Sequence, residues 1–191
     1  MTDARTSRHG RVAAARALEL PAGVALAPLP SHVDHRGEIV ELFQEKWDTG
    51  ITPVQWNLFS SEANVLRGMH VHLRHTDYLV MLSGSTLVGL RDLRAGSPTD
   101  GRAALFELRA GDGVALIVPP GVGHAFYCGH DARMLQGVSH YFDPDDEFGC
   151  HWADPGLGLD WPAIEPTLSD RDRNAPALRS LLERLPPFSA F

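Results

Sequence analysis

The chain has little cysteine, almost no lysine and no long hydrophobic run. Its two cysteines, Cys128 and Cys150, form neither a metal-ligand spacing nor a disulfide framework. No apolar stretch approaches the ~18 residues of a membrane-spanning helix. The first 20 residues carry four arginines, but no continuous apolar segment of the kind that a signal peptide needs. These absences favour a cytoplasmic protein without a membrane partner.

Positive charge is also scarce. The chain has 17 basic and 24 acidic residues, for a net charge of −7, and Lys46 is its only lysine. Because binding to a nucleic-acid duplex needs a basic surface, no nucleic-acid partner is expected. Hydrophobic residues make up 43% of the 191 residues and charged residues 21%, which is typical of a globular chain. We therefore expect a flexible N-terminal arm at 1–20 and a single domain at 21–191.

Short apolar runs separated by turn residues recur between about residues 23 and 142. Glycine or proline marks the joins, as at Gly84, Gly96 and Pro119. Many short strands at this spacing favour an all-β sandwich or barrel over βαβ units. The strands expected lie at 23–28, 38–43, 53–59, 64–72, 77–82, 86–92, 103–108, 114–118 and 132–142. One helix is expected at 175–185, where Leu178, Leu181, Leu182 and Leu185 have the spacing of one apolar stripe.

Three histidines stand out in two separate segments. His70 and His72 lie at i and i+2 on an expected strand, so their side chains should point to one face. His124 follows His72 after 52 residues in the segment PPGVGH, and it can join the pair if that segment folds back beside the first. Three imidazoles in one pocket serve either a metal ion or proton transfer.

The spacing around these histidines resembles that of the double-stranded β-helix, or cupin, written G-x5-H-x-H-x3,4-E-x6-G and G-x5-P-x-G-x2-H-x3-N. The chain departs from it at Asn64 for the first glycine, Asp77 for the glutamate and Cys128 for the asparagine. The resemblance implies an all-β jelly roll, here with a short C-terminal helical segment. It also raises the alternative of a divalent metal held by His70, His72, Asp77 and His124.

A longer series of motifs covers about residues 30 to 180. It comprises HRGEIVE at 35–41, QWN at 55–57, NVLRGMH at 64–70, DLR at 92–94, PGVGHAF at 120–126, WAD at 152–154, LDWP at 159–162 and LSDRD at 168–172. In order and spacing these motifs resemble the dTDP-4-dehydrorhamnose 3,5-epimerase family. The resemblance implies a metal-free sugar-nucleotide site without a cofactor, and a homodimer.

The resemblance also implies roles for individual residues. His70 matches the catalytic base, and Asp172 matches the carboxylate that orients it. A C4 ketone acidifies the protons at C3 and C5, and a neutral imidazole with a reference pKa of about 6.5 can remove one. Arg67 would stabilise charge on the C4 oxygen, and His72 is a further catalytic candidate. The candidates for substrate binding are Arg36, Glu41, Gln55, Asn57, His124, Gln136 and His140.

The chain departs from the family's pattern at three positions. Gln136 stands where the family has the tyrosine that returns a proton on the opposite face, and an amide has no group that titrates near neutral pH. His140 shares a strand face with Gln136 and is a candidate substitute. His72 replaces a glutamine, and Asp77 lies near the position of a substrate-binding lysine.

These patterns leave four functions open. The favoured one is an isomerase, most simply an epimerase, that acts on a nucleotide-linked 4-keto-6-deoxyhexose. The alternatives are a sugar-nucleotide 3,4-ketoisomerase in which His70 and His72 move a proton on one face, a metal-dependent cupin oxygenase or lyase, and a sugar-nucleotide-binding protein without catalysis.

Overall fold

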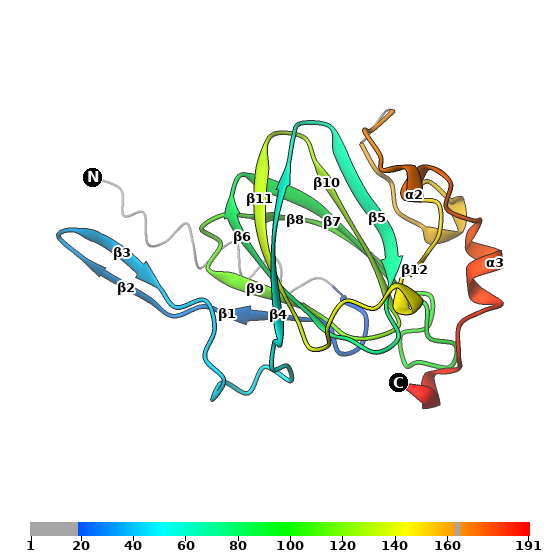
Figure 1. Cartoon of the computed structure of the whole chain (residues 1–191), viewed down its shortest axis with the longest axis horizontal. Coiled ribbons are helices and arrows are strands. Elements are labelled where there is room, and N and C mark those ends of the chain that lie inside the picture. The colour runs from blue at the N-terminus through cyan, green and yellow to red at the C-terminus, as the bar shows by residue number, and fades with distance from the viewer. Residues whose placement is uncertain (1–18, 163–164) are drawn as a thin grey trace.

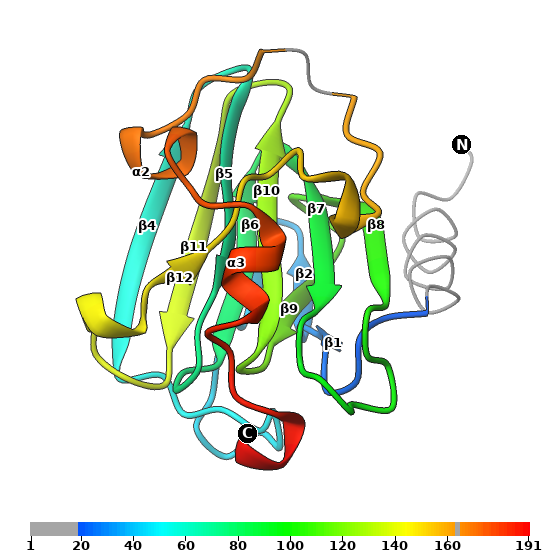
Figure 2. The ribbon, with the colours of Figure 1, turned by 90° about the vertical axis from the view of Figure 1, so that its right-hand side faces the viewer.

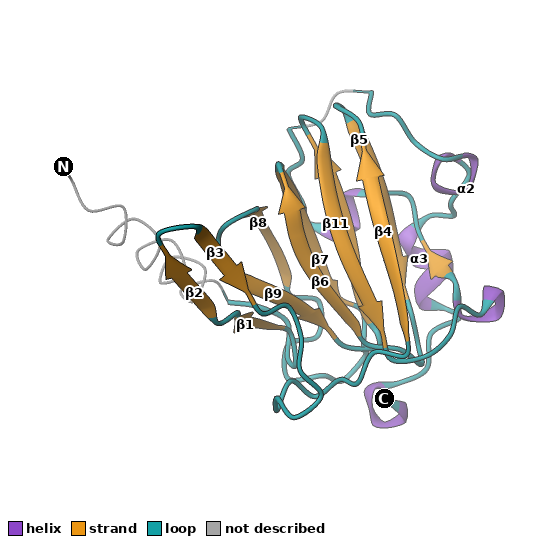
Figure 3. Cartoon of the chain, turned by 60° about the vertical axis from the view of Figure 1, so that its left-hand side comes forward, coloured by secondary structure: helices purple, strands orange, loops and turns teal. Residues whose placement is uncertain are grey.

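Two five-stranded antiparallel sheets face each other in the computed structural model, which describes residues 19–162 and 165–191 (Figures 1 and 3). Residues 1–18, most of the expected N-terminal arm, lie outside the described residues. The first sheet has the order β1 (Ala25–Pro28), β9 (Val114–Val118), β6 (Asp77–Ser83), β11 (Ala132–Val138) and β4 (Gln55–Ser61). The second has the order β12 (Phe148–Gly149), β5 (Val65–Val71), β10 (Val122–Cys128), β7 (Ser85–Asp92) and β8 (Ala103–Arg109). This is the predicted jelly roll.

The main core lies between the two sheets. Strand alternation turns Leu79 and Met81 of β6 toward Val88 and Leu90 of β7, and all four side chains are buried. Removing this apolar surface from water supplies the principal driving force for closing the sandwich. The sheets are thereby held face to face, with their strands in antiparallel register.

The C-terminal segment covers the outer face of the second sheet (Figure 2). Helix α3 (Leu178–Leu182) packs Leu178 and Leu181 against Met69 and Val71 of β5. The expected helix at 175–185 is therefore too long, and Leu182 is 46% exposed because it lies about 100° round the helix from Leu181. The other short helices are α2 (Asp170–Arg173) and the 3₁₀ turns Pro144–Asp146, Pro155–Leu157 and Phe188–Ala190.

A two-stranded hairpin projects away from the sandwich (Figure 1). It is formed by β2 (Ser31–Asp34) and β3 (Gly37–Val40). Val33 and Ile39 are 68% and 66% exposed on it, although both are apolar. The hairpin thus leaves apolar surface uncovered in the single chain.

Three strands were not expected from the sequence, namely β2, β10 and β12. Two others end earlier than expected: β3 ends at Val40 rather than at residue 43, and β11 ends at Val138 rather than at residue 142. β10 begins directly after Pro119, Pro120 and Gly121. These residues predict a turn, and the strand that follows the turn was not recognised. No helix in the described part of the chain has the length and apolar character needed to cross a membrane.

Candidate active site

A cavity of about 530 Å³ opens between the sheets beside β4, β5, β10 and β11. Its walls bring together residues that are far apart in the sequence. Of the predicted catalytic and substrate-binding residues it is lined by Gln55, Asn57, Arg67, His70, His72, His124, Gln136, His140 and Asp172. Arg36 and Glu41 are not among its lining residues: Arg36 lies at the tip of the projecting hairpin and Glu41 just after β3. The two are thus separated from the site in the single chain.

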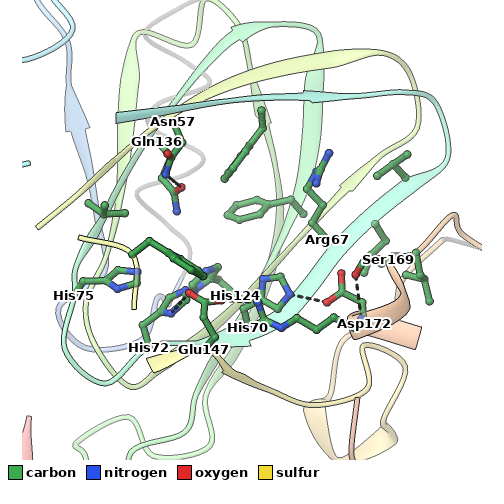
Figure 4. A pocket seen from close by; sticks show the side chains of 18 of the residues that line it. Asn57, Arg67, His70, His72, His75, His124, Gln136, Glu147, Ser169 and Asp172 are labelled. Atoms are coloured by element: carbon green, nitrogen blue, oxygen red, sulfur yellow. Dashed lines mark hydrogen bonds and ion pairs between the residues drawn. The ribbon is translucent and has the colours of Figure 1, made fainter. Parts of the chain in front are cut away.

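His70 and Asp172 form a close pair at one end of the cavity (Figure 4). The His70 Nε2 atom lies 2.6 Å from Asp172 Oδ1. Burial acts to raise the pKa of Asp172, but hydrogen bonds from His70, Gly68 and Ser169 outweigh it and hold the pKa below its ordinary value. A carboxylate at this position accepts a hydrogen bond from the Nε2–H group of His70, which leaves Nδ1 as the basic nitrogen.

The LSDRD motif explains how Asp172 reaches this position. Ser169 caps helix α2, and its hydroxyl accepts a hydrogen bond of 3.1 Å from the backbone N–H of Asp172. The backbone N–H of Gly68 lies 3.4 Å from Asp172 Oδ2. The cap and the strand together fix the carboxylate against the imidazole.

An irregularity in β5 lets Arg67 and His70 line the same cavity. The register between β5 and β10 shifts between the pairs His124–His70 and Phe126–Arg67, so residues three apart share a side. Gly68 sits inside this bulge with a φ of 117°, and an added Cβ would lie 2.7 Å from the His124 carbonyl oxygen. No other residue fits here without moving the backbone.

Arg67 is held against β4. Its Nε donates to Ser61 Oγ at 3.0 Å, one of its terminal nitrogens donates to the Ser60 carbonyl at 3.0 Å, and its guanidinium lies over the Phe59 ring. These contacts keep a fixed positive charge on the wall of the cavity that His70 and Asp172 also line. Figure 4 shows the Arg67 side chain directed away from the histidine–aspartate pair.

Three amides form a directed chain along the first sheet. Gln55 accepts from the Phe142 backbone N–H at 3.0 Å and donates to Asn57 at 3.0 Å. Asn57 in turn donates to Gln136 at 3.0 Å, and Gln136 donates to Asp77 Oδ1 at 2.6 Å. Every amide group in the chain is used, so Gln136 serves to bind Asp77.

A second cluster of titratable side chains lies beside the cavity. It contains His72, His75 and Asp77, with His124 Nε2 3.8 Å from Asp77 Oδ2. Burial lowers the pKa of His72 to about 4 and that of His124 to about 3, and it raises the pKa of Asp77. The imidazoles of His72 and His124 are therefore neutral at neutral pH.

The predicted metal ligands do not form a single cluster, although the His70 ring lies 6.4 Å from that of His124. His72, Asp77 and His124 lie together, whereas His70 is paired with Asp172. His75 belongs to the cluster and was missed in the sequence. Strand alternation could not reveal it, because His75 lies in the turn between β5 and β6.

The chain matches the model of the dTDP-4-dehydrorhamnose 3,5-epimerase family over residues 18–180. A dTDP-4-dehydro-6-deoxyglucose 3-epimerase from a Streptomyces species is 35% identical over 172 residues, which cover 84% of this chain and 88% of the relative. A dTDP-4-dehydrorhamnose 3,5-epimerase from Streptomyces griseus is 34% identical, covering 85% of this chain and 86% of the relative.

Solved structures agree with these relatives. A 3'-monoepimerase from Streptomyces bikiniensis in complex with dTDP-quinovose has a TM-score of 0.80 and 34% identity, covering 91% of this chain and 93% of that one. An epimerase from Mycobacterium tuberculosis has a TM-score of 0.81 and 30% identity, covering 90% and 92%. The jelly-roll fold and the assignment to an isomerase of nucleotide-linked 4-keto-6-deoxyhexoses are thereby confirmed, and the chain belongs to the dTDP-4-dehydrorhamnose 3,5-epimerase family of enzymes.

Proposed function

We propose that this enzyme removes a proton beside the ketone of a dTDP-linked 4-keto-6-deoxyhexose, with His70 as the base. The contact of 2.6 Å between His70 Nε2 and Asp172 Oδ1, at the wall of the cavity, carries this proposal. Asp172 holds the imidazole in the tautomer whose Nδ1 accepts a proton, and it stabilises the imidazolium that results.

Arg67 supports the same step by electrostatics. Proton removal next to a C4 ketone moves negative charge onto the C4 oxygen, and a fixed guanidinium stabilises that charge better than mobile water does. The hydrogen bonds to Ser60 and Ser61 restrain the Arg67 side chain before substrate binds. In this proposal Arg67 acts on the developing enolate.

Solvent exchange tests the base. In D₂O the wild-type enzyme should incorporate deuterium into dTDP-4-dehydro-6-deoxyglucose at the carbon beside the ketone, followed by NMR. His70→Ala should abolish the exchange, whereas His130→Ala, at an exposed position on the β10–β11 turn, should leave it unchanged. Exchange at the wild-type rate in His70→Ala would remove His70 from the role of base.

Inversion also needs a proton donor on the opposite face. Gln136 is committed to Asn57 and Asp77, so we propose that His140 takes the role expected of it. His140 lines the cavity, and its Nδ1 lies 3.0 Å from Ser139 Oγ. His140→Ala should then retain deuterium exchange but lose the epimerised product. The role would be contradicted if His140→Ala lost deuterium exchange and epimerised product to the same extent, or if it lost neither.

We propose further that the enzyme is a homodimer in which the hairpin of each protomer reaches the cavity of its partner. The hairpin exposes Val33 and Ile39, while edge strand β4 exposes Trp56 and Leu58. Apolar surface and an open sheet edge of this kind favour pairing with a second chain. A partner's hairpin would also give Arg36 and Glu41 the substrate contacts that their own chain does not offer.

Mixing inactive variants separates this arrangement from its alternatives. Arg36→Ala and His70→Ala, each weakly active or inactive alone, should regain activity when mixed and allowed to exchange subunits, because one of the two pockets is then intact. No recovery from a mixed dimer would show that Arg36 serves its own chain, and a monomer by light scattering would rule out the dimer. The absence of a nucleic-acid partner and the cytoplasmic location stay predictions.

A further inference from the structure

The buried cluster of His72, His75 and Asp77 lies beside the cavity, and the proton transfer proposed for His70 does not use it. One candidate ligand atom from each of His72, His75 and Asp77 lies within 4.8 Å of the others. His72 and His75 line the cavity, so an ion could reach them from the solvent side. Two imidazoles and one carboxylate form a donor set that zinc and related divalent ions bind in proteins.

Within the described part of the chain, each of the two histidines directs its Nδ1 atom toward an oxygen of Asp146, which leaves the Nε2 atom as the candidate ligand. His72 Nδ1 lies 3.1 Å from the Asp146 carbonyl oxygen, and His75 Nδ1 lies 3.5 Å from Asp146 Oδ2. Metal-ligating histidines commonly direct one nitrogen to such an oxygen, which fixes the tautomer and leaves the other nitrogen for the metal.

His75 shows this most clearly. Its side chain is more than nine-tenths buried, yet its Nε2 atom has no hydrogen-bond partner among the residues that the structure describes. The atom lies 3.7 Å from Asp77 Oδ1, too far for a hydrogen bond. Buried nitrogens are nearly always paired, so an Nε2 atom of this kind that faces a buried carboxylate is well placed to bind a ligand.

The surrounding hydrogen bonds also orient Asp77. The amide chain from Gln55 through Asn57 ends on Asp77 Oδ1, so this oxygen is approached by a donor from the first sheet. The Asp146 carboxylate binds the backbone N–H groups of Leu73 and Arg74 and thereby anchors the turn that carries His75. Support of this kind is typical of the outer shell of a metal site.

From this geometry we propose that His72, His75 and Asp77 bind one divalent transition-metal ion, Zn²⁺ in preference, with His124 as a neighbouring nitrogen donor. The site does not depend on the proposed epimerase chemistry, since His70 and Asp172 lie outside it. It differs from the ligand set expected from the cupin spacing, because His75 takes part in place of His70.

Titration of chelator-treated protein with Zn²⁺ and with Co²⁺ tests the site. We expect one equivalent of either ion to bind, measured by calorimetry for Zn²⁺ and by visible absorption for Co²⁺, whose ligand-field bands report nitrogen and oxygen donors. His75→Ala and Asp77→Asn should each weaken binding by at least about a hundredfold. His130→Ala, which removes an exposed histidine, should bind like the wild type.

Folding is checked separately, because either variant could disturb the cavity. dTDP binding and the thermal unfolding midpoint of the metal-free proteins should stay close to wild type in His75→Ala, so that a loss of metal reflects a lost ligand. Absence of saturable binding in the wild type overturns the proposal, as does tight binding that survives both substitutions. Deuterium exchange by the metal-free enzyme reports on His70 independently of either result.

Discussion

Gln136 donates a hydrogen bond of 2.6 Å to Asp77, and this contact joins two positions at which the sequence is expected to depart from its family. In the resemblance described above, Gln136 matches the family's tyrosine, and Asp77 lies near the match to its substrate-binding lysine. An amide can donate to a buried carboxylate and accept from Asn57 at the same time. The two departures are therefore coupled, and each provides the partner of the other.

Replacing Gln136 by Met should break this coupling while keeping the volume. Asp77 Oδ1 and Asn57 Nδ2 would each lose their partner, so we expect a loss of about 1–3 kcal/mol in the free energy of unfolding. Urea denaturation measures it, with Leu182→Met on the exposed side of α3 as the control. An unchanged midpoint would show that water replaces the amide without cost.

Asp172→Asn tests the orientation of the base. An amide in this position no longer selects the His70 tautomer with a proton on Nε2, so we expect kcat to fall by about 10²- to 10⁴-fold with little change in KM. Steady-state epimerisation assays measure the effect. Arg179→Ala, at an exposed position on α3, is the control. A kcat close to wild type would mean that Asp172 is structural.

Gly68→Ala should disrupt the bulge that directs the side chains of Arg67 and His70 into the same cavity. The added Cβ meets backbone atoms of His124 and Ala125, and the φ of 117° is unfavourable for alanine. We expect a loss of about 2–4 kcal/mol in the free energy of unfolding. Gly129→Ala, where the nearest atom lies 4.0 Å away, should cost little. Equal stability of the two variants would refute the steric argument.

Stability below pH 4 should depend on Asp92. Burial acts to raise the pKa of Asp92, but hydrogen bonds from Arg94, Thr99 and Ser97 outweigh it and lower the pKa below 3.8. A carboxyl group whose pKa is lowered on folding stabilises the folded protein at every pH above its unfolded-state pKa. This contribution is lost as the pH falls through the folded-state pKa.

Asp92→Asn should therefore be less stable than the wild type at pH 7, with a shallower decline in stability between about pH 4 and pH 2. Denaturant unfolding at a series of pH values compares the two proteins. Parallel curves would show that other carboxyl groups dominate acid unfolding.

Local pattern was sufficient for much of the fold. Alternating apolar residues and turn residues located β9 to the residue and β6 and β7 to within one residue of their ends. The pairing of His70 with Asp172, 102 residues apart, could not come from alternation, since it depends on where the C-terminal segment docks. It was expected only from the resemblance to the epimerase family, in which Asp172 matches the carboxylate that orients the base.

Other features of the site lay beyond sequence reasoning. The common facing of Arg67 and His70 depends on a bulge, and regular alternation would have placed them on opposite faces. His75 lies in a turn, where periodicity gives no direction for a side chain. The hydrogen bonds of Gln136 to Asn57 and Asp77 follow from the register of β11 between β4 and β6, which places the Gln136 amide between these two side chains.

The amide chain has a consequence for how the cavity responds to its surroundings. None of its three side chains gains or loses a proton in the range where proteins are folded, so its polarity is set by geometry and not by pH. A reversal of any one amide alone would place donor against donor on one of its sides and acceptor against acceptor on the other. The wall formed by Gln55, Asn57 and Gln136 therefore behaves as a permanently oriented dipole, and a substrate entering the cavity meets the same arrangement of donors and acceptors in acid and in alkali.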